Sequence, residues 1–280
     1  MTGEWDAWIG RSETRSDTVD PVRLAKWLAT FDREASGDDT APQGFHWCLC
    51  TPDEPTGALG ADGHPRRTDG ASFLPPIPLA RRMWASSEVQ FHAPLRVGAL
   101  VERRSTVRSI VSKKGASGEL VFVGIEHEVR AAKQMAVAER QTLVYRDVRL
   151  ASSTGQPQGP ADVVSGTTRR LFTAGAPLLF RYSALTFNTH RIHYDLPYAT
   201  GVEGYPGLVV HGPLTATLLM DLVRRDHGDH ALASFEFRGV APALAGQPLS
   251  LRMDRVDDRL NLFATVGEDR IVMSATGRLA

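Results

Sequence analysis

The 280-residue chain has few cysteines, no excess of either charge and no long apolar segment. Its two cysteines, Cys48 and Cys50, are separated by one residue and would point to the same face of a strand. They are too few for a disulfide framework or a complete zinc site, so a reduced, cytoplasmic setting is the simpler interpretation. Because no run of about 18 apolar residues occurs, an ordinary transmembrane helix is excluded. The first residues, MTGEWDAWIGRSETRSD, have no apolar core of a signal peptide and predict no secretion.

The charge balance is even, with 32 Lys plus Arg against 32 Asp plus Glu. No global field therefore favours nucleic acid or an anionic membrane, and neither is expected as a partner. Hydrophobic residues make up 42% and charged residues 23% of the chain, which is typical of a soluble globular protein. The length allows two modules of about 100 to 150 residues each.

The first predicted element is an amphipathic helix in the segment DPVRLAKWLATFD. Asp20 is a suitable N-cap, and Pro21 suits the first helical position. Four apolar residues recur at helical spacing and predict one buried face: Leu24, Trp27, Leu28 and Phe31. Residues 51–76 follow, rich in Pro, Gly and Asp, and predict a lid or a covering loop.

Two regions have the alternation and turn residues of antiparallel strands. Residues 88–146 predict one such meander, and residues 231–279 predict another. The composition of residues 151–168 predicts a linker between them. Before the second meander, the segment HGPLTATLLMDLVRRD predicts a helix whose apolar side consists of Leu214, Leu218, Leu219, Leu222 and Val223.

A short match indicates that the second half repeats the first. The pattern Ala-Pro-x3-Gly begins at Ala93 and again at Ala241, each time after a predicted strand. Two copies of a helix followed by a twisted antiparallel sheet predict an α+β double hot-dog, with clefts where each helix end meets the neighbouring module. The predicted modules are residues 1–150 and 169–280, joined by the linker. An unrelated pair of α+β domains is the alternative.

The densest cluster of potentially catalytic side chains is FNTHRIHYD, residues 187–195, which predicts a loop or short helix that delivers polar groups into a cleft. Adding water to a conjugated thioester requires one group that accepts a proton from water and one that delivers a proton to Cα. Histidine suits both roles, because its ordinary pKa of about 6.5 leaves either form accessible near neutrality.

The run N-x4-H-x-D-x2-Y-A, followed by EGYPGLVVHGPLT, resembles the signature of the MaoC-like (R)-specific enoyl-CoA hydratases. With MWASSEVQFHAPLRVG in the first half, nearly the whole chain resembles the fused double hot-dog branch of that family. This branch contains mitochondrial 3-hydroxyacyl-thioester dehydratases and bacterial mesaconyl- and itaconyl-CoA hydratases. The resemblance implies reversible hydration of a 2-enoyl-CoA, no metal, and no cofactor apart from the CoA of the substrate.

The resemblance also assigns roles at matching positions. In the family an Asp and a His, five residues apart, orient the attacking water, and Asn188 and His193 occupy these positions here. An amide accepts a hydrogen bond from water but cannot act as a base, so His193 is the expected proton carrier. Gly212, where the second helix should begin, is expected to donate its N–H to the enolate oxygen, with Thr215 as a hydroxyl contact.

Other polar residues are candidates for substrate binding: His190, His211, Arg181 and Arg191. The two arginines could bind CoA phosphates or a substrate carboxylate. Asp195 is expected to cap or fix the following turn rather than to act as a base. The positive tracts RRMW and RSTVRSIVSKK could border a phosphate site, or could be a solvated strand face.

Two other function classes remain open on this fold: an acyl-CoA thioesterase and a non-catalytic thioester-binding module. The first module has no N-x4-H-x-D pattern, so its cleft is expected to hold the acyl chain or the pantetheine arm without catalysis. A short branched dicarboxylic acyl group follows from the resemblance and the spare arginines. An acyl-carrier protein in place of CoA is the alternative thioester carrier, and a homodimer is a further expectation.

Overall fold

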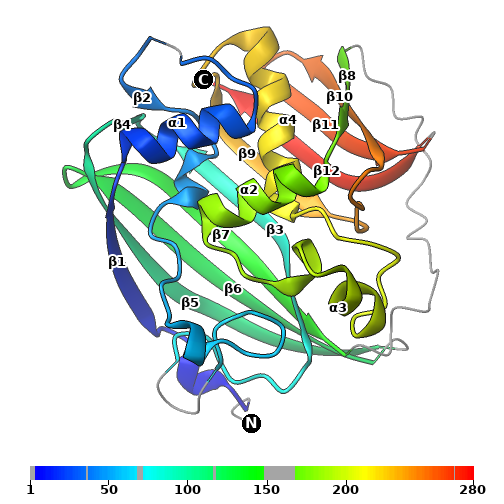
Figure 1. Ribbon diagram of the computed structural model, residues 1–280. Helices are drawn as coiled ribbons and strands as arrows, with labels where there is room; N and C mark the ends of the chain where they lie inside the picture. Colours follow the sequence, from blue (N-terminus) through cyan, green and yellow to red (C-terminus); the bar gives the residue numbers. More distant parts are fainter. Residues whose placement is uncertain (1–3, 36, 68–71, 116–117, 148–167, 268) are drawn as a thin grey trace.

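The computed structural model describes residues 4–35, 37–67, 72–115, 118–147, 168–267 and 269–280 (Figure 1). Its α-helices are α1 (Pro21–Thr30), α2 (Ala176–Thr186), α3 (Leu196–Gly201) and α4 (Gly212–His227). The first-half strands are β1 (Ser12–Thr18), β2 (Thr40–Ala41), β3 (Arg81–Phe91), β4 (Leu95–Arg96), β5 (Leu100–Gly115), β6 (Gly118–Ala131) and β7 (Gln134–Arg146). The second-half strands are β8 (Thr168–Thr173), β9 (Leu232–Gly239), β10 (Pro248–Val256), β11 (Arg259–Val266) and β12 (Arg270–Leu279).

The main sheet has ten strands in the order β1-β5-β6-β7-β3-β9-β12-β11-β10-β8. Neighbouring strands in this sheet pair antiparallel, including the central pair of β3 and β9. Read outward from this central pair, the two halves have the same order, because β3-β7-β6-β5-β1 corresponds to β9-β12-β11-β10-β8. The sheet order therefore shows the internal repeat that the Ala-Pro-x3-Gly match predicted.

The repeated glycines occupy the same turn in both halves. Gly98 has a φ of 79° and Gly246 a φ of 82°, a backbone conformation that favours glycine. The N–H of Gly98 donates to the carbonyl of Val19 after β1, and the N–H of Gly246 donates to the carbonyl of Ala174 after β8, each at 2.9 Å. This matching hydrogen bond explains why the short pattern recurs in the sequence.

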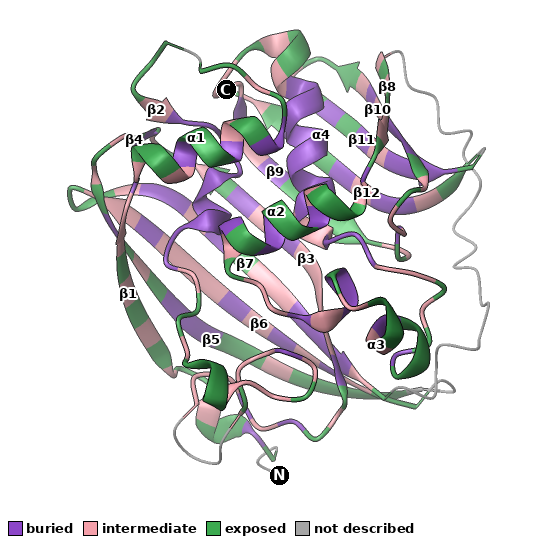
Figure 2. Ribbon diagram, viewed as in Figure 1, coloured by how far each residue is buried: buried purple, intermediate pink, exposed green. Residues whose placement is uncertain are grey.

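Helix α4 is the centre of the core. Residues 214–223 are buried on every side of the helix, including all five of the predicted apolar positions. Figures 1 and 2 show α4 lying across the concave face of the second-half strands, with the inward side of the sheet buried and α1 and α2 beside it on the same face. A helix that is buried all round needs a sheet that wraps it, as the hot-dog prediction requires.

The first half has a short 3₁₀ turn, Phe45–Cys48, where the second half has α4. The equivalence follows from the preceding backbone: Val97 N–H donates to Asp39 O at 2.9 Å, and Ala245 N–H donates to Leu208 O at 2.8 Å. The turn begins after Gly44, where an added Cβ would lie 2.9 Å from Met220 Cε, so it packs tightly against α4. Replacing a long helix by one turn leaves space beside the first-half sheet.

The predicted first helix is confirmed as α1. Asp20 accepts a hydrogen bond from the N–H of Arg23, and Pro21 is the first helical residue. Helix α1 packs against α2 and does not occupy the position in the first half that α4 has in the second half. Of the predicted linker, only Thr168 lies among the described residues, and it belongs to β8.

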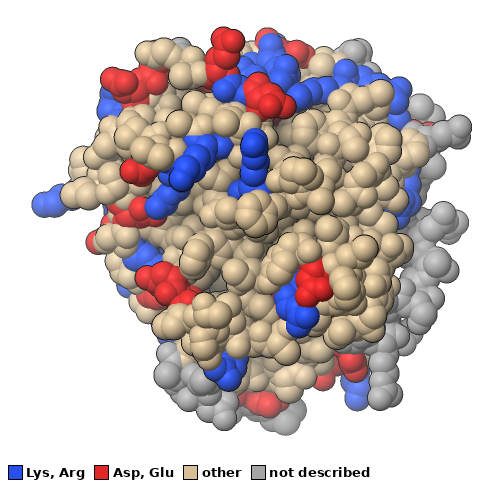
Figure 3. Space-filling view, viewed as in Figure 1, with Lys and Arg blue, Asp and Glu red and all other residues tan. Residues whose placement is uncertain are grey.

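Charges of both signs are interspersed on the face shown in Figure 3, as the even charge balance suggests. Among the residues that the structure describes, no helix has the length and apolar character needed to cross a membrane.

Candidate active site

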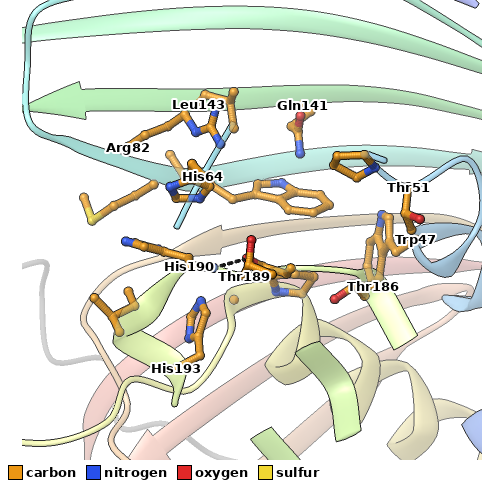
Figure 4. Close-up of a pocket in the computed structure, with 18 of the residues that line it drawn as sticks. Trp47, Thr51, His64, Arg82, Gln141, Leu143, Thr186, Thr189, His190 and His193 are labelled. Atoms are coloured by element: carbon orange, nitrogen blue, oxygen red, sulfur yellow. Dashed lines mark hydrogen bonds between the residues drawn. The ribbon is translucent and has the colours of Figure 1, made fainter. Parts of the chain in front are cut away.

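A cavity of about 900 Å³ lies between the two halves of the molecule. It is lined by β3 and β7, by the Phe45–Cys48 turn, by the covering segment (residues 51–67 and 72–74), by the loop after α2, and by the start of α4. Figure 4 shows side chains from these segments pointing toward the same space, among them Trp47, His64, Arg82, His190 and His193. Asn188, Gly212 and Thr215 also line it, so the structure brings together the residues expected to catalyse.

His193 lies in a 3₁₀ turn, Arg191–His193, and is buried. Its Nδ1 atom is 2.7 Å from the carbonyl oxygen of Val209. Because a carbonyl only accepts, Nδ1 carries the hydrogen and Nε2 is left with a lone pair on the cavity side. Burial, followed by the neighbouring charge of His190, lowers the pKa of His193 to about 3, so the imidazole is in its base form at neutral pH.

The start of α4 has backbone N–H groups that no side chain caps. His211 is the N-cap residue, but its Nε2 atom lies 2.9 Å from Ser183 Oγ instead of bonding back to the helix. Its ring stacks on His193, with 3.6 Å between ring centroids. Gly212, the first residue at this positive helix end, lines the same cavity as His193.

Thr215, one turn into α4, also lines the cavity, and its hydroxyl lies 3.4 Å from the carbonyl oxygen of His211. Asn188 follows Phe187, whose φ of 49° ends α2 and turns the chain toward the cavity. The Oδ1 atom of Asn188 accepts a hydrogen bond from the N–H of His190 at 3.0 Å. This bond fixes the amide while leaving its oxygen a second lone pair for water.

Behind His190 lies a buried charge pair that the sequence did not suggest. His190 Nε2 is 3.1 Å from Glu203 Oε1, and Glu203 Oε2 is 3.5 Å from Arg81 Nε. Glu203 is 4% exposed and Arg81 only 2%, so this carboxylate is the counter-charge of a guanidinium with no access to water. The guanidinium also lies over the ring of Tyr205. These contacts fix the ring of His190 beside His193, with 5.5 Å between the ring centroids.

The covering segment contributes a further imidazole, that of His64, which sequence reasoning also missed. Its ring centroid is 4.1 Å from that of His190, and its Nδ1 is 2.9 Å from Asp62 Oδ2. The segment docks closely: an added Cβ on Gly63 would lie 1.9 Å from the carbonyl oxygen of Thr189. No helical or strand pattern marks His64 in the sequence, because only the docked loop brings it to the cavity.

Asp62, His64 and His190 have ligand atoms within 4.8 Å of one another, a spacing that a metal ion could bridge. However, His64 Nδ1 is already paired with Asp62, and His190 Nε2 is paired with Glu203. A cation at this point would compete with both bonds. Two carboxylate–imidazole pairs therefore explain these contacts.

Arg181, Arg191 and Asp195 serve other contacts. Arg191 pairs with Asp195, with 2.7 Å between its Nη2 and the carboxylate, and donates to the carbonyl of Ala61. Asp195 accepts from the N–H of Tyr198 and so caps α3, as expected. Arg181 lies on α2 with its guanidinium 3.5 Å from the carbonyl oxygen of Ala29. Neither arginine lines the cavity, so the structure does not place either where it was expected to meet a substrate.

The first-half wall of the cavity is polar as well as aromatic. Trp47 Nε1–H donates to Glu139 Oε2 at 3.1 Å, and the hydroxyl of Ser87 donates to the other oxygen of the same carboxylate. His127 lies opposite Glu139 on the neighbouring strand. The position that begins α4 in the second half is here occupied by the turn that contains His46 and Trp47. Among the described residues, this wall has a single 3₁₀ turn in place of the long helix whose N-terminus lies beside His193 in the second half.

Comparison with known proteins identifies the family. A family model described as hydroxyacyl-thioester dehydratase type 2 matches residues 44–245. The chain is 39% identical over 281 residues to the mesaconyl-C(4)-CoA hydratase of Chloroflexus aurantiacus, and the match covers 99% of each chain.

Solved structures agree on the fold. The structure of HtdX from Mycobacterium tuberculosis matches with a TM-score of 0.70 at 18% identity, over 96% of this chain and 100% of that one. A second protein of that organism, described as having a double hot-dog fold, matches with a TM-score of 0.57 at 14% identity, over 97% and 96% of the two chains. The chain therefore belongs to the hydroxyacyl-thioester dehydratase type 2 family and is a hydro-lyase of enoyl thioesters with the double hot-dog fold.

Proposed function

We propose that this protein adds water to the double bond of a short, branched 2-enoyl-CoA that carries a free carboxylate, of the mesaconyl-C4 type. The extensive match to a mesaconyl-C(4)-CoA hydratase supports the acyl class. The observation that carries the chemistry is geometric. His193, with an unprotonated Nε2, and Gly212, at a helix start that no side chain caps, line one cavity.

In this mechanism the thioester oxygen accepts the N–H of Gly212 at the start of α4. A water molecule donates one hydrogen to His193 Nε2 and another to the Oδ1 atom of Asn188. His193 accepts the proton as the water oxygen bonds to Cβ, and the π electrons of the double bond move to the thioester oxygen. The helix N-terminus stabilises this enolate, because its N–H groups and dipole favour negative charge.

The second step returns the proton. Because burial lowers the pKa of His193 to about 3, its protonated form is more acidic than an ordinary imidazolium and gives the proton to Cα. The thioester carbonyl reforms, and the net change is addition of one water molecule. In this mechanism one imidazole serves as base and then as acid, since Asn188 has no proton to exchange. Thr215 serves as a hydroxyl contact to the thioester.

The partner is a CoA thioester in this proposal, and association into a homodimer remains a prediction. The test is a spectrophotometric screen of 2-enoyl-CoAs that differ in length, branching and terminal charge. We expect loss of enoyl absorbance, fastest with the branched carboxylated substrate, and no release of free thiol. Thiol release without hydration would instead indicate a thioesterase, and tight binding without turnover would indicate a binding module.

A further inference from the structure

The cavity contains an arginine whose side chain has no partner in the described part of the chain. Arg82, on β3, lines the cavity and forms no side-chain hydrogen bond or ion pair there. The arginines of the opposite wall are engaged: Arg15 pairs with Glu54 at 3.2 Å, and Arg103 donates to the carbonyl of Cys50. Figure 4 shows Arg82 with its guanidinium beside His64. Since an unpaired guanidinium in a concave site attracts anions, Arg82 marks a place for an anionic group.

The surroundings of Arg82 reinforce this positive character. Arg67 and Arg146 line the same cavity, and both have buried guanidine nitrogens without a hydrogen-bond partner. Arg67 lies over the ring of Tyr145, which is directly opposite Arg82 on β7. The described residues supply no carboxylate within ion-pair distance of any of these three arginines. Any anion that enters here therefore meets uncompensated positive charge.

Arg82 is also at the correct end of the cavity for the acyl group. It lies two residues before Trp84 on one strand, a spacing of about 7 Å that puts both side chains on the same side. The carbonyl oxygen of Trp84 is 3.8 Å from the point that a Cβ on Gly212 would occupy. Strand β3 therefore passes close to the proposed oxyanion donor at Trp84, and Arg82 lies one same-side position further along that strand.

We propose that Arg82 binds the free carboxylate of the acyl group and so selects a dicarboxylic substrate; this inference rests on the proposed function. In a mesaconyl-C4 thioester the carboxylate is attached to Cβ, about 4 Å from the thioester carbon across three carbon–carbon bonds. With the thioester oxygen at Gly212, that carboxylate extends toward β3. Pairing with Arg82 also reduces the negative charge next to Cβ, which favours attack by the water oxygen.

The test compares two substrates of nearly equal shape. 3-Methylcrotonyl-CoA has a methyl group where mesaconyl-C4-CoA has the carboxylate. We expect Arg82→Gln to lower kcat/KM about a hundredfold for mesaconyl-C4-CoA and less than threefold for 3-methylcrotonyl-CoA, because only the first loses a charge-assisted hydrogen bond. Arg82→Lys, which keeps the charge without the planar fork, should fall between Gln and wild type. Arg96→Gln, an exposed change on β4 outside the cavity, is the matched control and should leave both values unchanged.

The phosphates of CoA are a second source of anionic groups, so the assay is repeated with N-acetylcysteamine thioesters, which contain none. If Arg82→Gln also lowers kcat/KM for the mesaconyl-C4 N-acetylcysteamine thioester, this result supports carboxylate binding. If Arg82→Gln lowers kcat/KM for both CoA substrates but for neither N-acetylcysteamine thioester, Arg82 binds phosphate, and the inference is overturned. An equal loss for both acyl groups in every series overturns it too, because Arg82 is then a general catalytic or structural residue.

The inference and the proposed function fail in different ways. Hydration of 3-methylcrotonyl-CoA but not of mesaconyl-C4-CoA by the wild type overturns the role of Arg82 and the acyl class, while hydration itself stands. If the wild type hydrates neither of the two substrates, the proposed function is overturned. Thermal unfolding of each variant accompanies the kinetics, and Arg82→Lys carries the comparison if Arg82→Gln does not fold.

Discussion

Glu203→Gln removes one charge from the buried pair beside the site and tests how that pair stabilises the fold. The distance from Glu203 Oε2 to Arg81 Nε is 3.5 Å, and both side chains are almost fully buried. At an effective dielectric constant of about 20, two unit charges at that distance attract by about 5 kcal/mol. Gln keeps the shape and the hydrogen bond to His190 but leaves Arg81 without a counter-charge. We therefore expect the free energy of unfolding to fall by about 3 to 5 kcal/mol.

Urea denaturation at neutral pH measures this change, with Glu88→Gln as the matched control. Glu88 pairs with Arg140, and their side chains are 43% and 73% exposed, so removing that charge should change the free energy of unfolding by about 1 kcal/mol or less. The double variant Arg81→Met with Glu203→Leu should recover much of the loss, because it leaves no buried charge unpaired. If Glu203→Gln were no more destabilising than Glu88→Gln, the buried pair would not contribute as described.

Two further predictions concern the pH dependence and the covering segment. Since burial lowers the pKa of His193 to about 3, its base form persists well below neutrality. The kcat/KM for an enoyl-CoA should therefore stay constant from about pH 8 down to about pH 5. A decrease in kcat/KM with a midpoint near pH 6.5 would contradict this. Gly63→Ala should displace the covering segment, because its Cβ would meet Thr189 O and its φ of 89° disfavours a side chain. We expect at least a tenfold loss in kcat/KM and faster limited proteolysis within residues 51–67, and an unchanged proteolysis rate would argue against tight docking.

The elements that the sequence predicted well are those with strong local signals. Asp20 and Pro21 mark the start of α1, and the fully apolar stripe after His211 marks α4. Strand β1 was missed because SETRSDT is a polar edge strand with no apolar alternation. Strand β3 begins at Arg81 rather than near Glu88, because its first residues are held by pairing with β7 and not by their own pattern.

The site was predictable only where the motif is contiguous. His193, Asn188 and Gly212 lie close together in the sequence and were brought to one cavity. His64, Arg82 and Glu203 could not be found in this way, since the covering loop, β3 and the segment after α3 meet only in the folded chain. Arg181 and Arg191 were chosen as spare cations, but the fold turns the first away from the cavity and pairs the second with Asp195.

Replacement of His193 by Ala tests the central claim most directly, with turnover of a responsive enoyl-CoA followed by its absorbance. Because this imidazole is the proposed base and acid, kcat should fall about a hundredfold or more while the thermal unfolding temperature shows that the variant is folded. A folded His193→Ala protein that hydrates the substrate at nearly the wild-type rate would contradict the proposed chemistry.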